Sequence, residues 1–184
     1  LVLGSAVRFC AIPVFAEAAA SAVLPAWASV LAAVPGASRS DEAAQVVAQA
    51  IGRVVLGLRR FFVPVLPATC RAIRDLFWLT AEPACMEACR SALQAFAREP
   101  AESAQSQATA QLLRDMQHIA FEVLNHAAAA RRLEDHSELV VQLMSTTQCA
   151  LAMNPELACS LPTFPVSVQL IDACLTLSDK AAVK

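Results

Sequence analysis

The stretch VPVLPATCRAIRDLFWL, residues 63–79, decides the fold class of this chain. Pro64 and Pro67 fall in its first turns, where a missing backbone N–H costs a helix little. Its apolar side chains recur at the i, i+4, i+7 and i+11 positions: Leu66, Cys70, Ile73 and Phe77. This spacing places them on one side of an amphipathic helix that buries that side. The stretch therefore predicts a helix over residues 63–79.

The same period recurs on both sides of this stretch. We expect further helices at residues 24–34, 40–60, 82–98, 105–130, 134–153 and 164–177, and another that begins at Ser178. Pro35-Gly36 is expected to close the first of them, and Asn154-Pro155 to stop the helix that precedes it. Asp135 and Glu138 have the spacing of a capping box, with Asp135 as the N-cap.

The composition agrees with an all-α fold class. Of the 184 residues, 57% are apolar, 16% are charged and only four are Gly. Disordered chains need low hydrophobicity and high charge, and collagen-like chains need far more Gly. The sequence contains 39 Ala and no Tyr, so strong helix formers outweigh the β-branched and aromatic residues typical of sheets.

An uncharged stretch of membrane-spanning length runs from Ala18 to Ser38. It consists mostly of Ala, Ser and Val, contains Pro25 and Pro35, and has only two Leu, so it lacks the residues that drive insertion. We therefore expect no membrane insertion.

The sequence offers little for catalysis, and we predict that the protein is not an enzyme. Its formal net charge is −2, so we expect no nucleic-acid partner. No Gly-rich phosphate loop or nucleophile elbow occurs. Cys85 and Cys89 are four residues apart, but no further ligands are positioned to complete a metal site, and buried free thiols are the better interpretation. We therefore predict no catalytic, cofactor-binding or metal-binding residues, and no cofactor.

Alternate helix starts recur at an almost regular distance along the chain. They fall near Asp41, Pro83, Asp135 and Asp179, with gaps of 42, 52 and 44 residues. Two helices in each unit of roughly 40–47 residues is the register of HEAT and armadillo repeats. The pattern favours an α-solenoid of stacked HEAT-type antiparallel helix pairs, and an ordinary bundle of seven or eight helices is the alternative. The expected pairs cover residues 24–60, 63–98, 105–153 and 164–184, about three and a half repeats of one continuous solenoid over residues 1–184.

Several segments in the C-terminal third resemble one family. They are HSELVVQLM at 136–144, NPEL at 154–157, PVSVQLI at 165–171 and LTLSDKA at 175–181. Their order and spacing are similar to those of the importin-β family (karyopherins), in the subgroup that contains transportin-SR and importin-thirteen. A weaker similarity extends back to Leu24. The resemblance implies a HEAT-repeat fragment from the C-terminal part of a longer nuclear transport receptor.

The resemblance also implies the function and the partners. Such a receptor carries protein cargo between cytoplasm and nucleus, binds the Ran GTPase through regions outside this fragment, and contacts nucleoporins. In this subgroup an Arg-rich helix holds Arg-Ser-rich cargo, and residues 41–58 fall at that place. The polar positions that remain there and at the end of the helix are the candidate partner-binding residues: Gln45, Gln49, Arg53, Arg59 and Arg60. This is a poor phosphate clamp compared with a row of Arg, which puts Arg-Ser recognition in doubt. The alternative is a generic helical-repeat scaffold with no role in transport.

Overall fold

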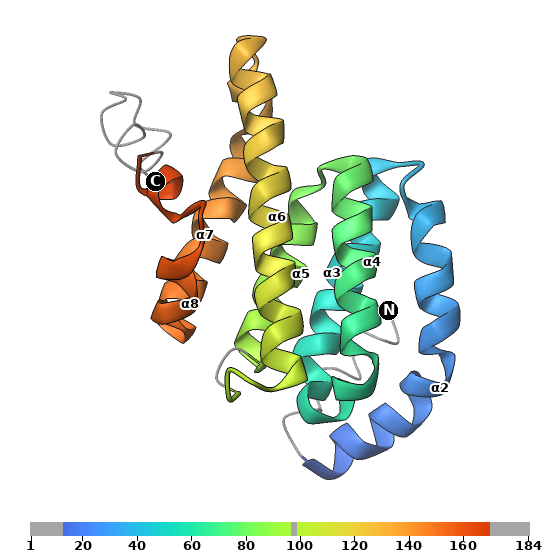
Figure 1. The fold of residues 1–184 in the computed structure, drawn as a ribbon. Helices are drawn as coiled ribbons and strands as arrows, with labels where there is room; N and C mark the ends of the chain where they lie inside the picture. The colour runs from blue at the N-terminus through green and yellow to red at the C-terminus, as the bar shows by residue number, and fades with distance from the viewer. Residues whose placement is uncertain (1–12, 97–98, 170–184) are drawn as a thin grey trace.

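The computed structural model describes residues 13–96 and 99–169, with side chains from residue 17 onward. Every regular element in these ranges is helical, which confirms the all-α class (Figure 1). The elements are α2 (Pro13–Ala37), α3 (Asp41–Leu58), η1 (Arg59–Val65), α4 (Leu66–Thr80), α5 (Pro83–Phe96), α6 (Ala104–Ala129), η2 (Leu133–His136), α7 (Ser137–Met153) and α8 (Pro155–Ser160). A further helical segment covers 164–169, and the rest of the helix expected over 164–177, like the one expected from Ser178, lies outside the described residues.

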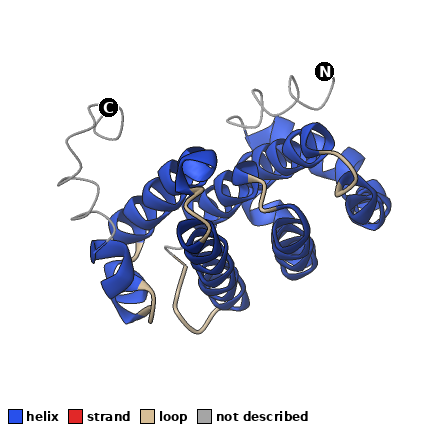
Figure 2. Ribbon diagram, turned by 90° about the horizontal axis from the view of Figure 1, so that it is seen from above, coloured by secondary structure: helices blue, strands red, loops and turns tan. Residues whose placement is uncertain are grey.

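The helices lie in two rows (Figure 2). In one row α2 packs on α4 and α4 on α6, and in the other α3 packs on α5 and α5 on α7. From α2 to α7, each helix therefore contacts the next but one along the chain, and successive helices alternate between the rows. The continuation of these rows as a HEAT-type solenoid, and the division into the four expected helix pairs, remain predictions.

The core lies between the two rows and is filled by the apolar faces of the helices. In α4, the residues that the sequence places on the buried face lie there, since Ile73 and Phe77 are 1% and 0% exposed. Met86, Leu113 and Leu143 bring α5, α6 and α7 into the same cluster. The close approach of α3 to α5 depends on Gly52, because an added Cβ would lie 3.1 Å from the backbone of α5.

Buried polar groups join the helices at defined points. The side-chain amide of Gln117 on α6 donates to Thr147 on α7 at 3.2 Å, and its oxygen accepts from Thr163. Thr146 on α7 donates to the carbonyl of Met86 on α5 at 3.3 Å. Among the described residues no buried side-chain nitrogen or oxygen lacks a partner. These bonds add specificity to an otherwise apolar interface, because an unpaired buried polar group is costly.

The helix ends agree with the sequence at three places. Ser40 caps α3 by accepting from the amide of Ala43, and Asn154 ends α7 and caps α8 by accepting from the amide of Leu157. Pro67 lies in the first turn of α4, as expected, whereas Pro64 belongs to the preceding 3-10 turn.

Two expected helix starts are wrong. Pro25 lies inside α2, which begins at Pro13 and not at Leu24, whereas Pro35 and Gly36 lie in its last turn, before its end at Ala37. Each proline removes only one backbone hydrogen bond, and Figure 1 shows α2 bent along its length, as is usual for helices with internal prolines. Asp135 is not an N-cap, because its carboxylate accepts from the guanidinium of Arg132 at 2.9 Å and α7 begins two residues later.

One helix among the described residues is long and apolar enough to cross a membrane, at Glu17–Ala37 of α2. This is a test of length and composition only, and a core helix of a water-soluble protein passes it as well. In the structure, Trp27 of this helix is 2% exposed and contacts Phe62 of η1, with the rings 5.1 Å apart.

Candidate protein-binding surfaces

The first candidate surface is the outer side of α3. Gln45 and Arg53 are exposed and Gln49 is half-buried, while Ala48 and Val55 on the opposite side pack into the core. The three polar residues stand four apart, so they form one line along the helix. None of their side chains has a partner among the described residues, and their role in binding remains a prediction.

Arg59 and Arg60 lie where α3 ends, and each guanidinium already has a contact within the chain. The backbone of Arg59 has φ 43°, which terminates the helix, and its guanidinium donates to the carbonyl of Leu56 at 3.4 Å. The guanidinium of Arg60 lies 4.9 Å from the centre of the Phe61 ring, within the range of a cation–π contact. Both side chains are exposed, so both remain accessible to a partner.

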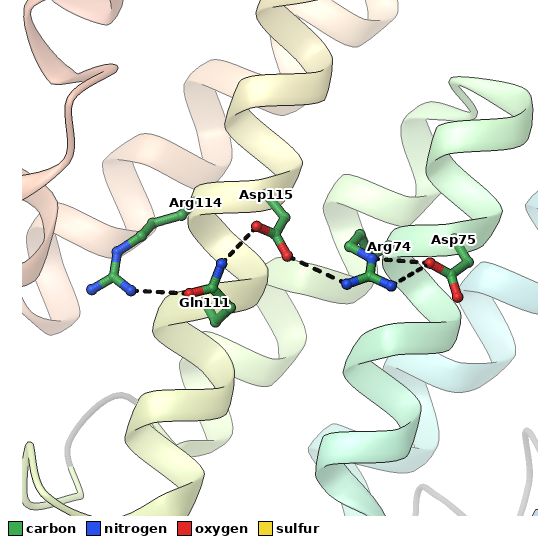
Figure 3. Close-up of polar contacts among 5 residues, drawn as sticks. All are labelled: Arg74, Asp75, Gln111, Arg114 and Asp115. Atoms are coloured by element: carbon green, nitrogen blue, oxygen red, sulfur yellow. Dashed lines mark hydrogen bonds and ion pairs between the residues drawn. The ribbon is translucent and has the colours of Figure 1, made fainter.

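A second surface, which the sequence did not indicate, crosses from α4 to α6 (Figure 3). Arg74 of α4 pairs with its neighbour Asp75 at 2.7 Å and reaches Asp115 of α6 at 3.8 Å. Asp115 also accepts from Gln111 at 2.7 Å, and Gln111 accepts from Arg114 at 3.3 Å. The hydrogen bond to Asp75 raises the pKa of Arg74. These side chains bond mainly to one another, so their main effect is to join α4 to α6, and they leave little free charge for a partner.

A pocket lies between the C-terminal ends of α4 and α6, and we call it the Trp78 pocket. It has a volume of about 430 Å³. Trp78 lines one side and is 62% exposed, which is unusual for so large an apolar residue. The apolar wall comes from α6 and the residue that follows it: Ile119, Val123, Ala127 and Ala130. The polar lining comes from α6 and from the segment that follows it: Glu122, His126, Arg132 and His136.

The sequence contains one signal that points to Trp78. It follows Phe77 directly, so it stands about 100° around the helix from the buried face of α4. An exposed Trp or Arg is a common anchor of protein interfaces. Only the packing of α6 against α4, however, creates a pocket beside this ring.

Three of the cysteines that the structure describes lie in the interior, whereas Cys149 is half-buried and Cys159 is exposed. Cys85 and Cys89 are both buried, as predicted, and Cys70 lies in the core with them. Burial raises the pKa of Cys70 and of Cys85 to about 12 and that of Cys89 well above its ordinary value. These thiols are therefore poor nucleophiles. No group of three His, Cys, Asp or Glu among the described residues is arranged to hold a metal ion.

Comparison with known proteins gives no family for this chain. A scan against protein-family models finds no match, and neither a search of curated proteins nor a search of solved structures finds one. The interpretation of these surfaces therefore depends on their own geometry and on the sequence resemblance described above.

Proposed function

We propose that this chain is a helical scaffold that binds protein partners. The observation that carries the proposal is the alternation of helices between two rows. Because each helix packs on the next but one, every row presents a long outer side to solvent. Arrays of this kind serve as extended binding surfaces for other proteins. Exposed Val46 on α3, Trp78 on α4 and Val141 on α7 are apolar groups available on these sides.

We further propose that the scaffold is part of a nuclear transport receptor of the importin-β family, which moves between cytoplasm and nucleus. The proposal is supported by the sequence resemblance and by the positions of the resembling residues in the fold. Leu139 and Leu143 of the family-like segment are 1% and 0% exposed, so they are the residues by which α7 packs into the core. Asn154 ends that helix and Pro155 begins α8. Ran-GTP and nucleoporins are the expected partners of the full receptor, and protein cargo is the expected partner of this part.

Binding to Ran-GTP by the full-length protein that contains this chain tests the transport proposal. We expect the full-length protein to bind Ran loaded with GTP and not Ran loaded with GDP, measured by surface plasmon resonance with each form immobilised. Equal binding, or none, to the two forms would remove the transport role. The alternative, a helical-repeat scaffold with another role, would then remain.

The α3 surface can be tested independently with charge reversal. The variant Arg53→Glu changes the polar line on α3 and leaves the core untouched, because Arg53 is exposed. The matched control is Arg71→Glu, an exposed arginine on α4 in the other row. We expect cargo recovered with the full-length protein to decrease for Arg53→Glu only. Equal recovery from the two variants would show that cargo does not use this surface.

A further inference from the structure

We propose that the Trp78 pocket receives an arginine side chain of a partner protein. The inference depends on the proposed function only in taking the partner to be a protein, and it does not require a role in nuclear transport. The evidence is the set of groups that face the pocket and the charge around it.

The pocket offers hydrogen-bond acceptors on one side. Nδ1 of His126 lies 2.8 Å from the carbonyl oxygen of Glu122, and two acceptors cannot share that contact, so Nδ1 carries the proton. In the neutral imidazole Nε2 is then an acceptor. The carboxylate of Glu122 is a second acceptor in the lining. One of its oxygens lies 3.4 Å from Nε2 of His118, and the other has no partner among the described residues.

The aromatic side of the pocket suits a flat cation. The indole of Trp78 is the best of the aromatic rings for a cation–π contact, and a guanidinium also stacks on such a ring. The pocket lies beside the C-terminal end of α6, where the helix dipole favours positive charge. The aliphatic wall from α6 provides a surface for the methylene stem of an arginine.

Charge in this region favours a cation over an acidic group. Between residues 122 and 138 the chain carries four carboxylates and two guanidiniums, a formal charge of −2 with neutral histidines. Arg132 also lines the pocket, and its formal charge is balanced by that of Asp135, with which it pairs at 2.9 Å. An arginine is favoured over a lysine because its planar fork can meet Glu122 and His126 while it stacks on Trp78.

The two tryptophans of the chain make this proposal directly testable. Trp78 is 62% exposed, whereas Trp27 is 2% exposed and is not part of the pocket lining, so it serves as an internal reference. The probe is N-acetyl-L-arginine amide, titrated into the ¹⁵N-labelled 184-residue chain while the two indole N–H signals are followed by NMR. N-acetyl-L-citrulline amide is the control, since it has the same shape without the charge. We expect the arginine probe to move the Trp78 signal, and the citrulline probe to leave both signals in place.

A matched pair of variants tests the role of the carboxylate. Glu122→Gln removes the acceptor charge of the pocket, and Glu99→Gln removes another exposed carboxylate that lies outside it. We expect the arginine probe to bind about tenfold more weakly to Glu122→Gln and unchanged to Glu99→Gln, as for the loss of one charge-assisted hydrogen bond. Circular dichroism of each variant confirms that it is folded.

Three results would overturn the inference: no shift of Trp78 with the arginine probe, an equal shift with citrulline, or unchanged binding to Glu122→Gln. None of them affects the proposed function, which is tested with Ran and with the α3 variants. Conversely, a specific arginine response in a chain whose full-length form ignores Ran-GTP would support the pocket and remove the transport role alone.

Discussion

Trp27 attaches α2 to the rest of its row, and its removal should measure the strength of that attachment. Its indole N–H donates to the hydroxyl of Thr69 on α4 at 2.9 Å, in a buried position. The Thr69 hydroxyl donates its own proton to the carbonyl of Val65 at 2.9 Å, so its oxygen is free to accept from the indole N–H. The indole ring also meets Phe62 edge-on, at 81° between the planes.

The size of the effect follows from these contacts. Trp27→Phe loses a net hydrogen bond of about 1 kcal/mol and part of a buried ring, so we expect a loss of about 2–3 kcal/mol in the free energy of unfolding. Thr69→Val leaves the buried indole N–H unpaired, which costs about 1–3 kcal/mol. The double variant should lose about 1 kcal/mol less than the two single losses combined, because the bond can be broken only once.

The assay is urea unfolding followed by far-ultraviolet circular dichroism, since tryptophan fluorescence changes with the substitution itself. Trp78→Phe is the matched control, and we expect it to cost less than about 0.5 kcal/mol because Trp78 is exposed. Additive losses for the two single variants, within about 0.3 kcal/mol, would refute the hydrogen bond. A Trp27→Phe variant as stable as Trp78→Phe would refute the packing of α2 on α4.

Three further predictions concern the interior of the two rows. Gly52→Ala should lower the melting temperature through a loss of about 1–2 kcal/mol of stability, because the new methyl group crowds α5 and this cost exceeds the gain in helix propensity. Gly36→Ala should raise the melting temperature, because its new methyl group meets nothing within 4 Å. The opposite order would contradict the close contact of α3 and α5. Gln117→Leu should lower the urea midpoint by the equivalent of about 1–3 kcal/mol, since the Thr163 hydroxyl loses its acceptor and the Thr147 hydroxyl keeps only its bond to the carbonyl of Leu143. An unchanged midpoint would show that the bonds to Gln117 are dispensable. Burial raises the pKa of Cys70 and of Cys85 from 9.0 to about 12, so the folded state is stabilised in full by the two neutral thiols below pH 9.0. As the pH rises from 9.0 toward 12, the free energy of unfolding should fall by about 1.4 kcal/mol per pH unit for each thiol. Urea unfolding between about pH 8 and about pH 10 should show this decline, and a Cys70→Ala/Cys85→Ala variant should show a smaller one.

Local sequence was sufficient for most of the helices, although the first half of α2 and the short helix α8 were not expected. The apolar spacing over residues 63–79 predicts α4 almost to its ends, because periodicity and the residues that disfavour a helix act within a few turns. The stop at Asn154-Pro155 is also local, since the proline limits the backbone of the residue before it. Where the outcome depended on distant contacts, the same reasoning was wrong. Pro25 does not begin a helix, because α2 already begins at Pro13, and Asp135 is held by Arg132 instead of capping α7.

The surfaces divide in the same way. The line of Gln45, Gln49 and Arg53 is a property of helical spacing, so the sequence alone determines that these residues share one side of α3. The Trp78 pocket is different, because its ring and its carboxylate lie on helices whose approach no local pattern encodes. Sequence by itself determined an all-helical chain with amphipathic faces. Only the tertiary structure decided which helices share a row and which exposed groups meet, because those outcomes depend on packing between residues far apart in the chain.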